Sequence, residues 1–160
     1  DRVIASEEAA FDGKLAFARR YDPSLPDIPA DSDHLHEAFQ NIVRNACEAA
    51  LANASSRPAH VELRTAFESR FGRRGSNGRS RLRRAIRVDV LDSGAGVDKA
   101  HLRNVFNAFS SSKSAGRGLG LTVVKEVINA HSGQIEIESD GEGTRMSVFL
   151  PMAEGGTHAG

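Results

Sequence analysis

Apolar and polar residues alternate along five stretches of the chain, and this alternation predicts β-strands. The stretches are residues 14–19, 60–67, 85–91, 134–139 and 144–150. A period of two places every second side chain on one face of a sheet, so half of each strand can contribute to a core. Residues 140–143, Asp-Gly-Glu-Gly, predict a hairpin turn between the last two strands.

Two longer stretches repeat their apolar residues at helical spacing instead. In the first, Asp31 is a predicted N-cap and apolar positions recur through residues 35–50. The second runs from about 118 to 131, and Gly133 is placed to end it. This helix is expected to bury four side chains, Leu121, Val124, Val127 and Ile128. A short helix capped by Asp98 is expected to run to about Phe106.

These elements predict an α+β fold. Strands joined by hairpins, with two long helices between them, indicate a two-layer sandwich with helices on one face of a mixed, mostly antiparallel sheet. A single domain is expected over residues 1–151, because 160 residues with 39% hydrophobic content can bury one core. Two polar stretches are expected to be a long hairpin tip (68–84) and a flexible loop (107–117), and residues 152–160 a disordered tail.

Charge and cysteine content narrow the partners. The 21 basic and 21 acidic residues cancel, so the chain as a whole gives no electrostatic case for nucleic acid or anionic lipid. Seven arginines fall within residues 70–84, but Phe71 is the one aromatic residue among them, which favours a solvated hairpin over nucleic-acid binding. The single cysteine, Cys47, is interpreted as a buried small side chain and suits a reducing, cytoplasmic environment.

The first predicted helix carries a polar stripe beside its apolar one. Asn41 and Asn45 are four residues apart and project from one face, and Glu37 and Glu48 lie on the same stripe. Amide oxygens suit a Mg²⁺ ion that phosphate and water mainly hold. A solvated flank is the alternative and, on this helix alone, the commoner case. The choice depends on what else converges there.

Asp92-Ser-Gly94-Ala-Gly96 follows a predicted strand directly. This places a carboxylate at the edge of the sheet, where it can accept a hydrogen bond from an exocyclic amine such as that of adenine. The glycines remove bulk where a flat ligand could approach the backbone. An ordinary Asp-Gly turn is the competing interpretation.

Three glycines at alternate positions, Gly116, Gly118 and Gly120, open the second predicted helix. Free N–H groups and the helix dipole attract phosphate there, and Lys113 and Arg117 add positive charge. Glycine costs roughly 1 kcal/mol relative to alanine in a helix interior, so packing alone seldom calls for three. The spacing matches neither the P-loop nor the dinucleotide-binding glycine motif.

Taken in order, these motifs resemble the N, G1, F, G2 and G3 boxes of histidine kinases. The matching segments are Asn41–Ala46, Asp92–Gly96, Phe106–Phe109, Gly116–Leu121 and Gly141–Thr144. The resemblance implies the Bergerat ATP-binding fold, which histidine kinases share with gyrase, Hsp90 and MutL. Within the family the chain is most similar to the nitrogen-regulatory NtrB group, although Ser110-Ser-Ser-Lys113 departs from the Thr-Thr-Lys-like lid common there.

The resemblance also implies roles. Asn45 is expected to coordinate Mg²⁺, Asn41 to lie near the phosphates and Asp92 to bind the adenine amine. Residues 107–117 are expected to form an ATP lid with Phe109 packing at its base. The full set of residues expected to bind ATP is Asn41, Asn45, Glu48, Asp92, Gly94, Gly96, Phe109, Lys113, Gly116, Arg117, Gly118, Leu119, Gly120, Leu121 and Thr144.

A kinase of this family transfers the γ-phosphate of ATP to a histidine on a separate dimerisation domain, for relay to an aspartate of a response regulator. None of the six histidines stands in the His-Glu-rich helical context of such an acceptor, so the acceptor, and with it any certain catalytic residue, is expected outside this chain. The parent is expected to be a homodimer, and this domain to contact neither membrane nor nucleic acid. Two alternatives stay open: an ATP-sensing pseudokinase, and a gyrase- or MutL-type ATPase.

A lid ordered by the γ-phosphate predicts nucleotide-dependent protease resistance. Trypsin cleavage after Lys113 or Arg117 should slow when an ATP analogue and Mg²⁺ are added, as followed by mass spectrometry of the fragments. Cleavage rates that do not change with nucleotide would contradict a closing lid.

Overall fold

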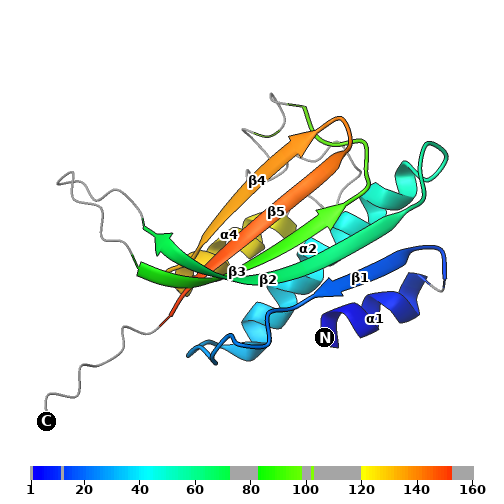
Figure 1. Ribbon diagram of the computed structural model, residues 1–160. Coiled ribbons are helices and arrows are strands. Elements are labelled where there is room, and N and C mark those ends of the chain that lie inside the picture. Colours follow the sequence, from blue (N-terminus) through cyan, green and yellow to red (C-terminus); the bar gives the residue numbers. More distant parts are fainter. Residues whose placement is uncertain (1, 12, 73–82, 99–101, 103–119, 153–160) are drawn as a thin grey trace, which may run out of the picture.

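A computed structural model describes residues 2–11, 13–72, 83–98, 102 and 120–152. The described strands form one sheet in the order β1-β2-β3-β5-β4 (Figure 1). They are β1 (Ala16–Arg20), β2 (His60–Phe71), β3 (Arg83–Asp92), β4 (Gln134–Asp140) and β5 (Gly143–Pro151). Strand β1 pairs with β2 in parallel, and the other pairs are antiparallel.

The described helices, α1 (Arg2–Phe11), α2 (Ser32–Ala52) and α4 (Gly120–Ala130), cover one face of this sheet (Figure 1). The predicted α+β sandwich is therefore confirmed. Its core lies between the two layers and draws on α1, α2, α4 and every strand of the sheet. None of these helices has both the length and the apolar character needed to cross a bilayer.

Helix α2 begins where its sequence predicts. The Asp31 side chain accepts hydrogen bonds from the backbone N–H groups of Asp33 at 3.1 Å and His34 at 3.0 Å, which satisfies two of the free donors of the first turn. The buried positions of α2 are Ala38, Ile42, Val43, Ala46, Cys47 and Ala50. Burial raises the pKa of the Cys47 thiol to about 12, consistent with its predicted place in the core.

The end of α4 corrects the prediction for Gly133. Ser132, with φ of 56°, takes the left-handed conformation that ends the helix, and the Gly133 N–H donates to the Ile128 carbonyl at 2.9 Å. A Cβ at Gly133 would lie 2.5 Å from the Phe149 carbonyl oxygen, so close packing on β5 is what requires glycine here. Of the four side chains expected to be buried, Val124 and Ile128 are fully buried and Leu121 and Val127 partly so.

Several boundaries differ from the predictions. Helix α1 was not predicted, and β2 and β3 continue through residues 68–71 and 83–84 of the expected hairpin tip, whose residues 73–82 lie outside the described part. The expected helix 98–106 is described only at its start, where the Leu102 N–H donates to the Asp98 carbonyl. Met152, expected in the tail, donates to the Arg84 carbonyl, and residues 153–160 lie outside the described part.

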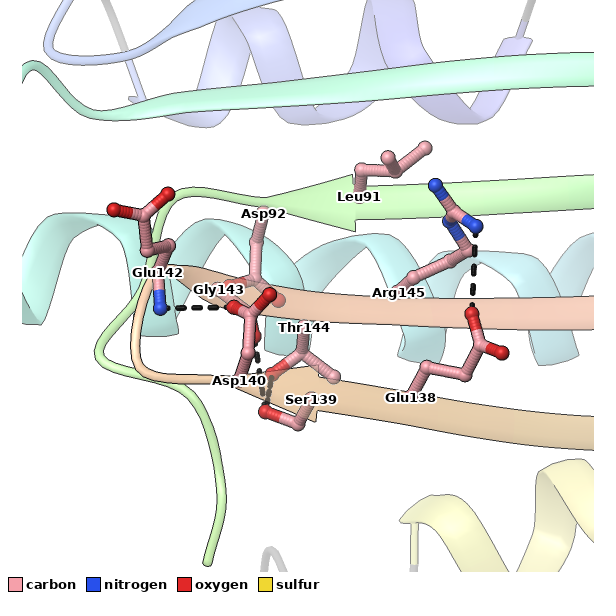
Figure 2. Close-up of a pocket in the computed structure, with 9 residues that line it drawn as sticks. All are labelled: Leu91, Asp92, Glu138, Ser139, Asp140, Glu142, Gly143, Thr144 and Arg145. Carbon is pink, nitrogen blue, oxygen red and sulfur yellow. Dashed lines mark hydrogen bonds and ion pairs between the residues drawn. The ribbon is translucent and has the colours of Figure 1, made fainter.

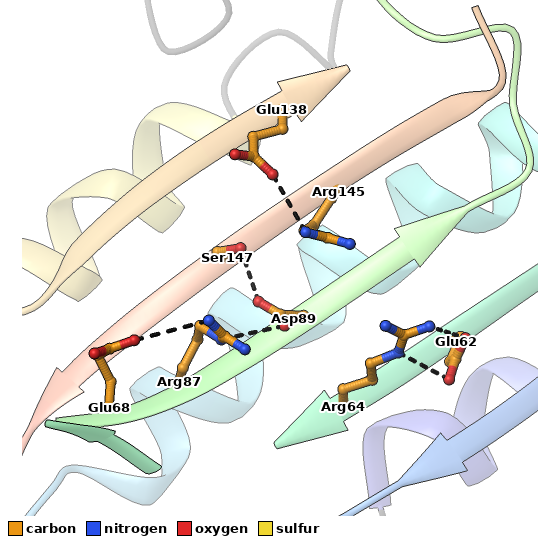
Figure 3. A network of polar contacts seen from close by, with 8 residues as sticks. All are labelled: Glu62, Arg64, Glu68, Arg87, Asp89, Glu138, Arg145 and Ser147. Atoms are coloured by element: carbon orange, nitrogen blue, oxygen red, sulfur yellow. Dashed lines mark hydrogen bonds and ion pairs between the residues drawn. The ribbon is translucent and has the colours of Figure 1, made fainter. Parts of the chain in front are cut away.

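The face of the sheet away from the helices carries paired charges (Figure 3). Arg64, Asp89 and Ser147 are aligned across β2, β3 and β5. Arg64 donates two hydrogen bonds to Glu62, which holds the pKa of that carboxyl below its usual value. The Ser147 hydroxyl donates to Asp89 at 2.7 Å, and Arg87 lies 3.3 Å from the same carboxylate. These acidic groups are therefore neutralised by neighbours on their own face.

One ion pair with a buried carboxylate fixes α1 on α2, and it generates a stability prediction. Glu7 is fully buried, and Arg44 donates to it at 3.1 Å. Arg44→Met should lower the free energy of unfolding by about 1–3 kcal/mol in urea denaturation, because a buried carboxylate loses its donor. Arg19→Met is the control, since the Arg19–Glu8 pair is 35% and 40% exposed and should contribute less than about 1 kcal/mol. Equal losses in both variants would contradict this account.

Candidate functional site

Asp92, the last residue of β3, stands where the sheet meets α2. It is paired with Thr144 of β5 across the ladder. The backbone N–H of Gly94 donates to its Oδ1 at 2.8 Å, and the backbone of Thr144 donates to the same carboxylate. Burial raises the pKa of Asp92, and these two hydrogen bonds oppose the rise. The carboxylate is therefore held in one orientation by backbone donors and retains capacity to accept another hydrogen bond.

A cavity of about 120 Å³ opens beside this carboxylate. Its walls come from α2, β3, the segment after β3, α4, β4 and β5. The lining residues are Ile42, Asn45, Ala46, Ala49, Val90, Asp92, Val97, Leu121, Ile137, Thr144 and Met146. Apolar side chains dominate, with a carboxylate, a hydroxyl and an amide as the polar groups. Such a lining suits a flat, largely apolar ring that carries a hydrogen-bond donor on its edge.

Two glycines let the chain turns around Asp92 pack backbone against backbone. A Cβ at Gly96, whose φ is +77°, would lie 1.9 Å from the Asp140 carbonyl oxygen. A Cβ at Gly143 would lie 2.1 Å from the carbonyl oxygen of Asp92. The prediction that Gly96 leaves room for a flat ligand therefore needs correction. The β4–β5 hairpin itself fills the space beside Gly96, and a side chain at this position would clash with it.

The asparagine stripe of α2 faces the start of α4. The Asn41 side-chain amide donates to the Glu37 carbonyl at 3.1 Å, and its Oδ1 would lie 3.4 Å from a Cβ at Gly120. Asn45, one turn further along, lines the cavity. Glu48 is half-buried on the same helix and does not line the cavity. The polar stripe of α2 thus lies against the start of α4 at Gly120.

The structure brings together most of the described residues that the sequence singles out. Asn45, Asp92, Leu121 and Thr144 line the cavity. A Cβ at Gly94 would lie 2.7 Å from Asp92 Oδ1, so this glycine keeps the carboxylate free of steric contact. Six expected residues lie outside the described part of the chain: Phe109, Lys113, Gly116, Arg117, Gly118 and Leu119.

Sequence reasoning missed the apolar floor of the cavity and one hydroxyl beside it. Val97, Ile137 and Met146 form part of the floor, and the alternation of β4 and β5 could have identified the last two as inward-facing. Ser139 accepts a hydrogen bond from Val97 N–H and donates one to the Gly143 carbonyl. No pattern in the sequence marks that serine.

A second hollow, of about 410 Å³, lies against the β4–β5 hairpin (Figure 2). It shares Asp92 and Thr144 with the first cavity but is otherwise largely charged. Glu138 pairs with Arg145 at 3.3 Å, and Asp140 accepts from the backbone N–H of Glu142 (Figure 2). The smaller cavity, rather than this one, combines a carboxylate with apolar walls. Within the described residues no three His, Cys, Asp or Glu side chains gather as metal ligands.

Comparison with known proteins identifies the family. Residues 30–154 match the family described as "Histidine kinase-, DNA gyrase B-, and HSP90-like ATPase". The "Sensory histidine kinase/phosphatase NtrB" of Rhodobacter capsulatus is 34% identical over 154 residues, which are 96% of this chain and 41% of that protein. The chain thus spans about two-fifths of the length of this curated relative.

Solved structures share the fold. The mycobacterial sensor histidine kinase MprB has a TM-score of 0.73 and 23% identity, with 95% of this chain and 91% of that chain covered. Full-length ShkA in complex with AMPPNP has a TM-score of 0.69 and 25% identity, with 94% of this chain and 28% of that chain covered. The predicted resemblance to NtrB-type histidine kinases is confirmed. The chain belongs to the histidine kinase-, DNA gyrase B- and HSP90-like ATPase family, in which it is the ATP-binding catalytic domain of a sensor histidine kinase.

Proposed function

We propose that this domain binds Mg·ATP between α2, α4 and the β4–β5 hairpin and presents the γ-phosphate to a histidine of a separate dimerisation domain. The observation that carries the proposal is the Asp92 carboxylate, oriented by backbone donors at the edge of an apolar cavity. An exocyclic amine is the donor that this acceptor suits, and the apolar walls suit the faces of a purine. The relative ShkA, crystallised with the ATP analogue AMPPNP, supports this assignment.

In this proposal the remaining residues contact different parts of the nucleotide. Asp92 and Thr144 form the base end of the site, and Gly94 and Gly96 shape the turn that follows Asp92. Leu121 of α4 lines the cavity beside Asp92. The lid, residues 107–117 with Phe109 at its base and Leu119 shortly after it, closes over the other end. Gly116, Gly118 and Gly120 offer backbone N–H groups to the phosphates at the start of α4. Lys113 and Arg117 add positive charge.

Asn45 is the proposed ligand of Mg²⁺, with Asn41 and Glu48 nearby on the same helix stripe. Asn45 lines the cavity, and an amide oxygen is a hard, neutral donor of the kind that Mg²⁺ accepts when phosphates supply most of its ligands. Bound Mg²⁺ neutralises charge on the phosphates. The work of this chain is then positioning, because phosphoryl transfer needs little covalent help from the protein.

The parent protein and its partners follow from this function. We propose that the parent is a homodimer whose dimerisation domain carries the acceptor histidine, and that a response regulator receives the phosphoryl group in the cytoplasm. The domain itself extends over residues 1–151, with the lid at 107–117. The full-length parent incubated with radiolabelled ATP should accumulate an acid-labile phosphohistidine. An intact site without any phosphohistidine would instead favour an ATP-sensing pseudokinase.

Asn41 distinguishes this proposal from a gyrase- or MutL-type ATPase. Those enzymes use a glutamate on the first helix to activate water, and in this chain Asn41 stands at that position with its amide donating to the Glu37 carbonyl. An amide cannot accept a proton at neutral pH, so it cannot serve as the general base. Slow hydrolysis of ATP by the isolated domain is expected.

The metal role of Asn45 gives a testable prediction. Asn45→Ala should weaken ATP binding at least about tenfold in the presence of Mg²⁺ and have little effect in EDTA, measured by calorimetric titration. Asn129→Ala, an exposed asparagine of α4, is the control and should bind as the unmodified domain does. Equal losses with and without Mg²⁺ would show that Asn45 acts on something other than the metal.

The raised pKa of Asp92 gives a second prediction, with opposite signs for stability and binding. Burial disfavours the ionised carboxylate, so Asp92→Asn should leave the free energy of unfolding at neutral pH unchanged or higher. The same change should weaken ADP binding about tenfold or more. An asparagine side chain has one oxygen and one NH2 group, so if its oxygen accepts from the Gly94 N–H, its NH2 group faces the purine amine. The reverse orientation sets the NH2 group against the Gly94 N–H, and either way two donors meet.

The pH profile completes this test. Binding of ADP to the unmodified domain should weaken on acidification at a pH above the usual range of an aspartate, since a raised pKa means earlier protonation of the acceptor. Asp92→Asn should lack that step. If Asp92→Asn bound ADP as tightly as the unmodified domain does, Asp92 would not be the residue that recognises the base.

A further inference from the structure

The Ser139 hydroxyl, at the inner side of β4, lies between the two turns that frame the proposed base site. The backbone N–H of Val97 donates to it at 2.7 Å, and it donates to the Gly143 carbonyl at 2.9 Å. The hydroxyl of Thr144 lies 3.2 Å away (Figure 2). Val97 belongs to the segment after Asp92, whereas Gly143 and Thr144 open β5. One side chain therefore connects both turns.

Counting donors and acceptors fixes how these groups are oriented. A serine hydroxyl has one hydrogen and two lone pairs. An amide N–H can only donate and a carbonyl can only accept, so Val97 occupies one lone pair of Ser139 and Gly143 takes its hydrogen. In the remaining contact Thr144 is then the donor, which fixes the rotation of a hydroxyl that lines the cavity.

The glycine at position 96 makes this arrangement possible. A Cβ at Gly96 would lie 2.9 Å from Ser139 Oγ, as well as 1.9 Å from the Asp140 carbonyl oxygen. Any side chain there would move the Val97 turn away from the hairpin. The serine and the glycine thus depend on one another. Asp92 directly precedes the first of the two segments that they hold together and pairs with Thr144 of the second.

We propose that Ser139 is a positioning residue for the purine site: it links the turn after Asp92 to the β4–β5 hairpin and fixes the Thr144 hydroxyl before nucleotide binds. This inference rests on the proposed function, since it assigns the base to the cavity beside Asp92. Ser139 makes no contact with the nucleotide in this account. Its effect on binding comes from preorganisation of Asp92, Val97 and Thr144.

Ser139→Ala is the test, with Ser147→Ala as a matched control. Both serines lie on the β4–β5 hairpin and donate a hydrogen bond, but Ser147 points to the opposite face, toward Asp89. Calorimetry with ADP and with inosine diphosphate, thermal unfolding and amide hydrogen exchange are measured on both variants and on the unmodified domain. Inosine diphosphate replaces the purine amine with a carbonyl, so its use measures recognition of that amine.

Ser139→Ala should bind ADP roughly fivefold to tenfold more weakly. The ratio of its affinities for ADP and inosine diphosphate should be smaller than in the unmodified domain. Hydrogen exchange at the Val97 amide should be faster. Ser147→Ala should keep both the affinity and the ratio, whatever its thermal stability. An unchanged affinity and ratio in Ser139→Ala would overturn the proposal, as would equal weakening by Ser147→Ala. If the unmodified domain ignored ADP, the proposed function itself would fail, while Val97 exchange would still report on the link.

Discussion

The backbone of the β4–β5 hairpin packs directly on the backbone at the end of β3, and the candidate site depends on this contact. The Cβ positions of Gly96 and Gly143 are occupied by the carbonyl oxygens of Asp140 and Asp92. Only glycine permits such an approach. The Thr144 backbone reaches the Asp92 carboxylate across this contact, and the Gly94 N–H reaches it within the turn that follows β3. Together they hold a half-buried acceptor against an apolar cavity.

Helix α2 supplies the opposite wall through its periodicity. Its apolar stripe, which includes Ile42 and Ala46, is buried in the core, and the stripe that carries Asn41 and Asn45 meets the cavity and α4. A rotation of the helix would expose the first stripe as it moved the second, so burial of the core also fixes the amides. The ion pair between Arg44 and the buried Glu7 carboxylate adds a contact from the same helix to α1.

Elements with strong periodicity could be predicted from the sequence, and so could the motif residues. Helix α1 could not, because the charged Glu7 takes the buried position between Ile4 and Phe11 and so interrupts the apolar repeat. The outer ends of β2 and β3 were missed because charged residues there are held by backbone pairing. Ser139 has no signature, because its role comes from three contacts that depend on the folded hairpin.

The central claim is that Asp92 recognises the amine of an adenine nucleotide in the cavity beside α2. Its most direct test is a calorimetric comparison of ADP and inosine diphosphate binding to the unmodified domain. The carboxylate accepts from the amine and repels the carbonyl that replaces it, so ADP should bind at least about tenfold more tightly. Equal affinities for the two nucleotides, or no binding of ADP at millimolar concentration, would contradict the account.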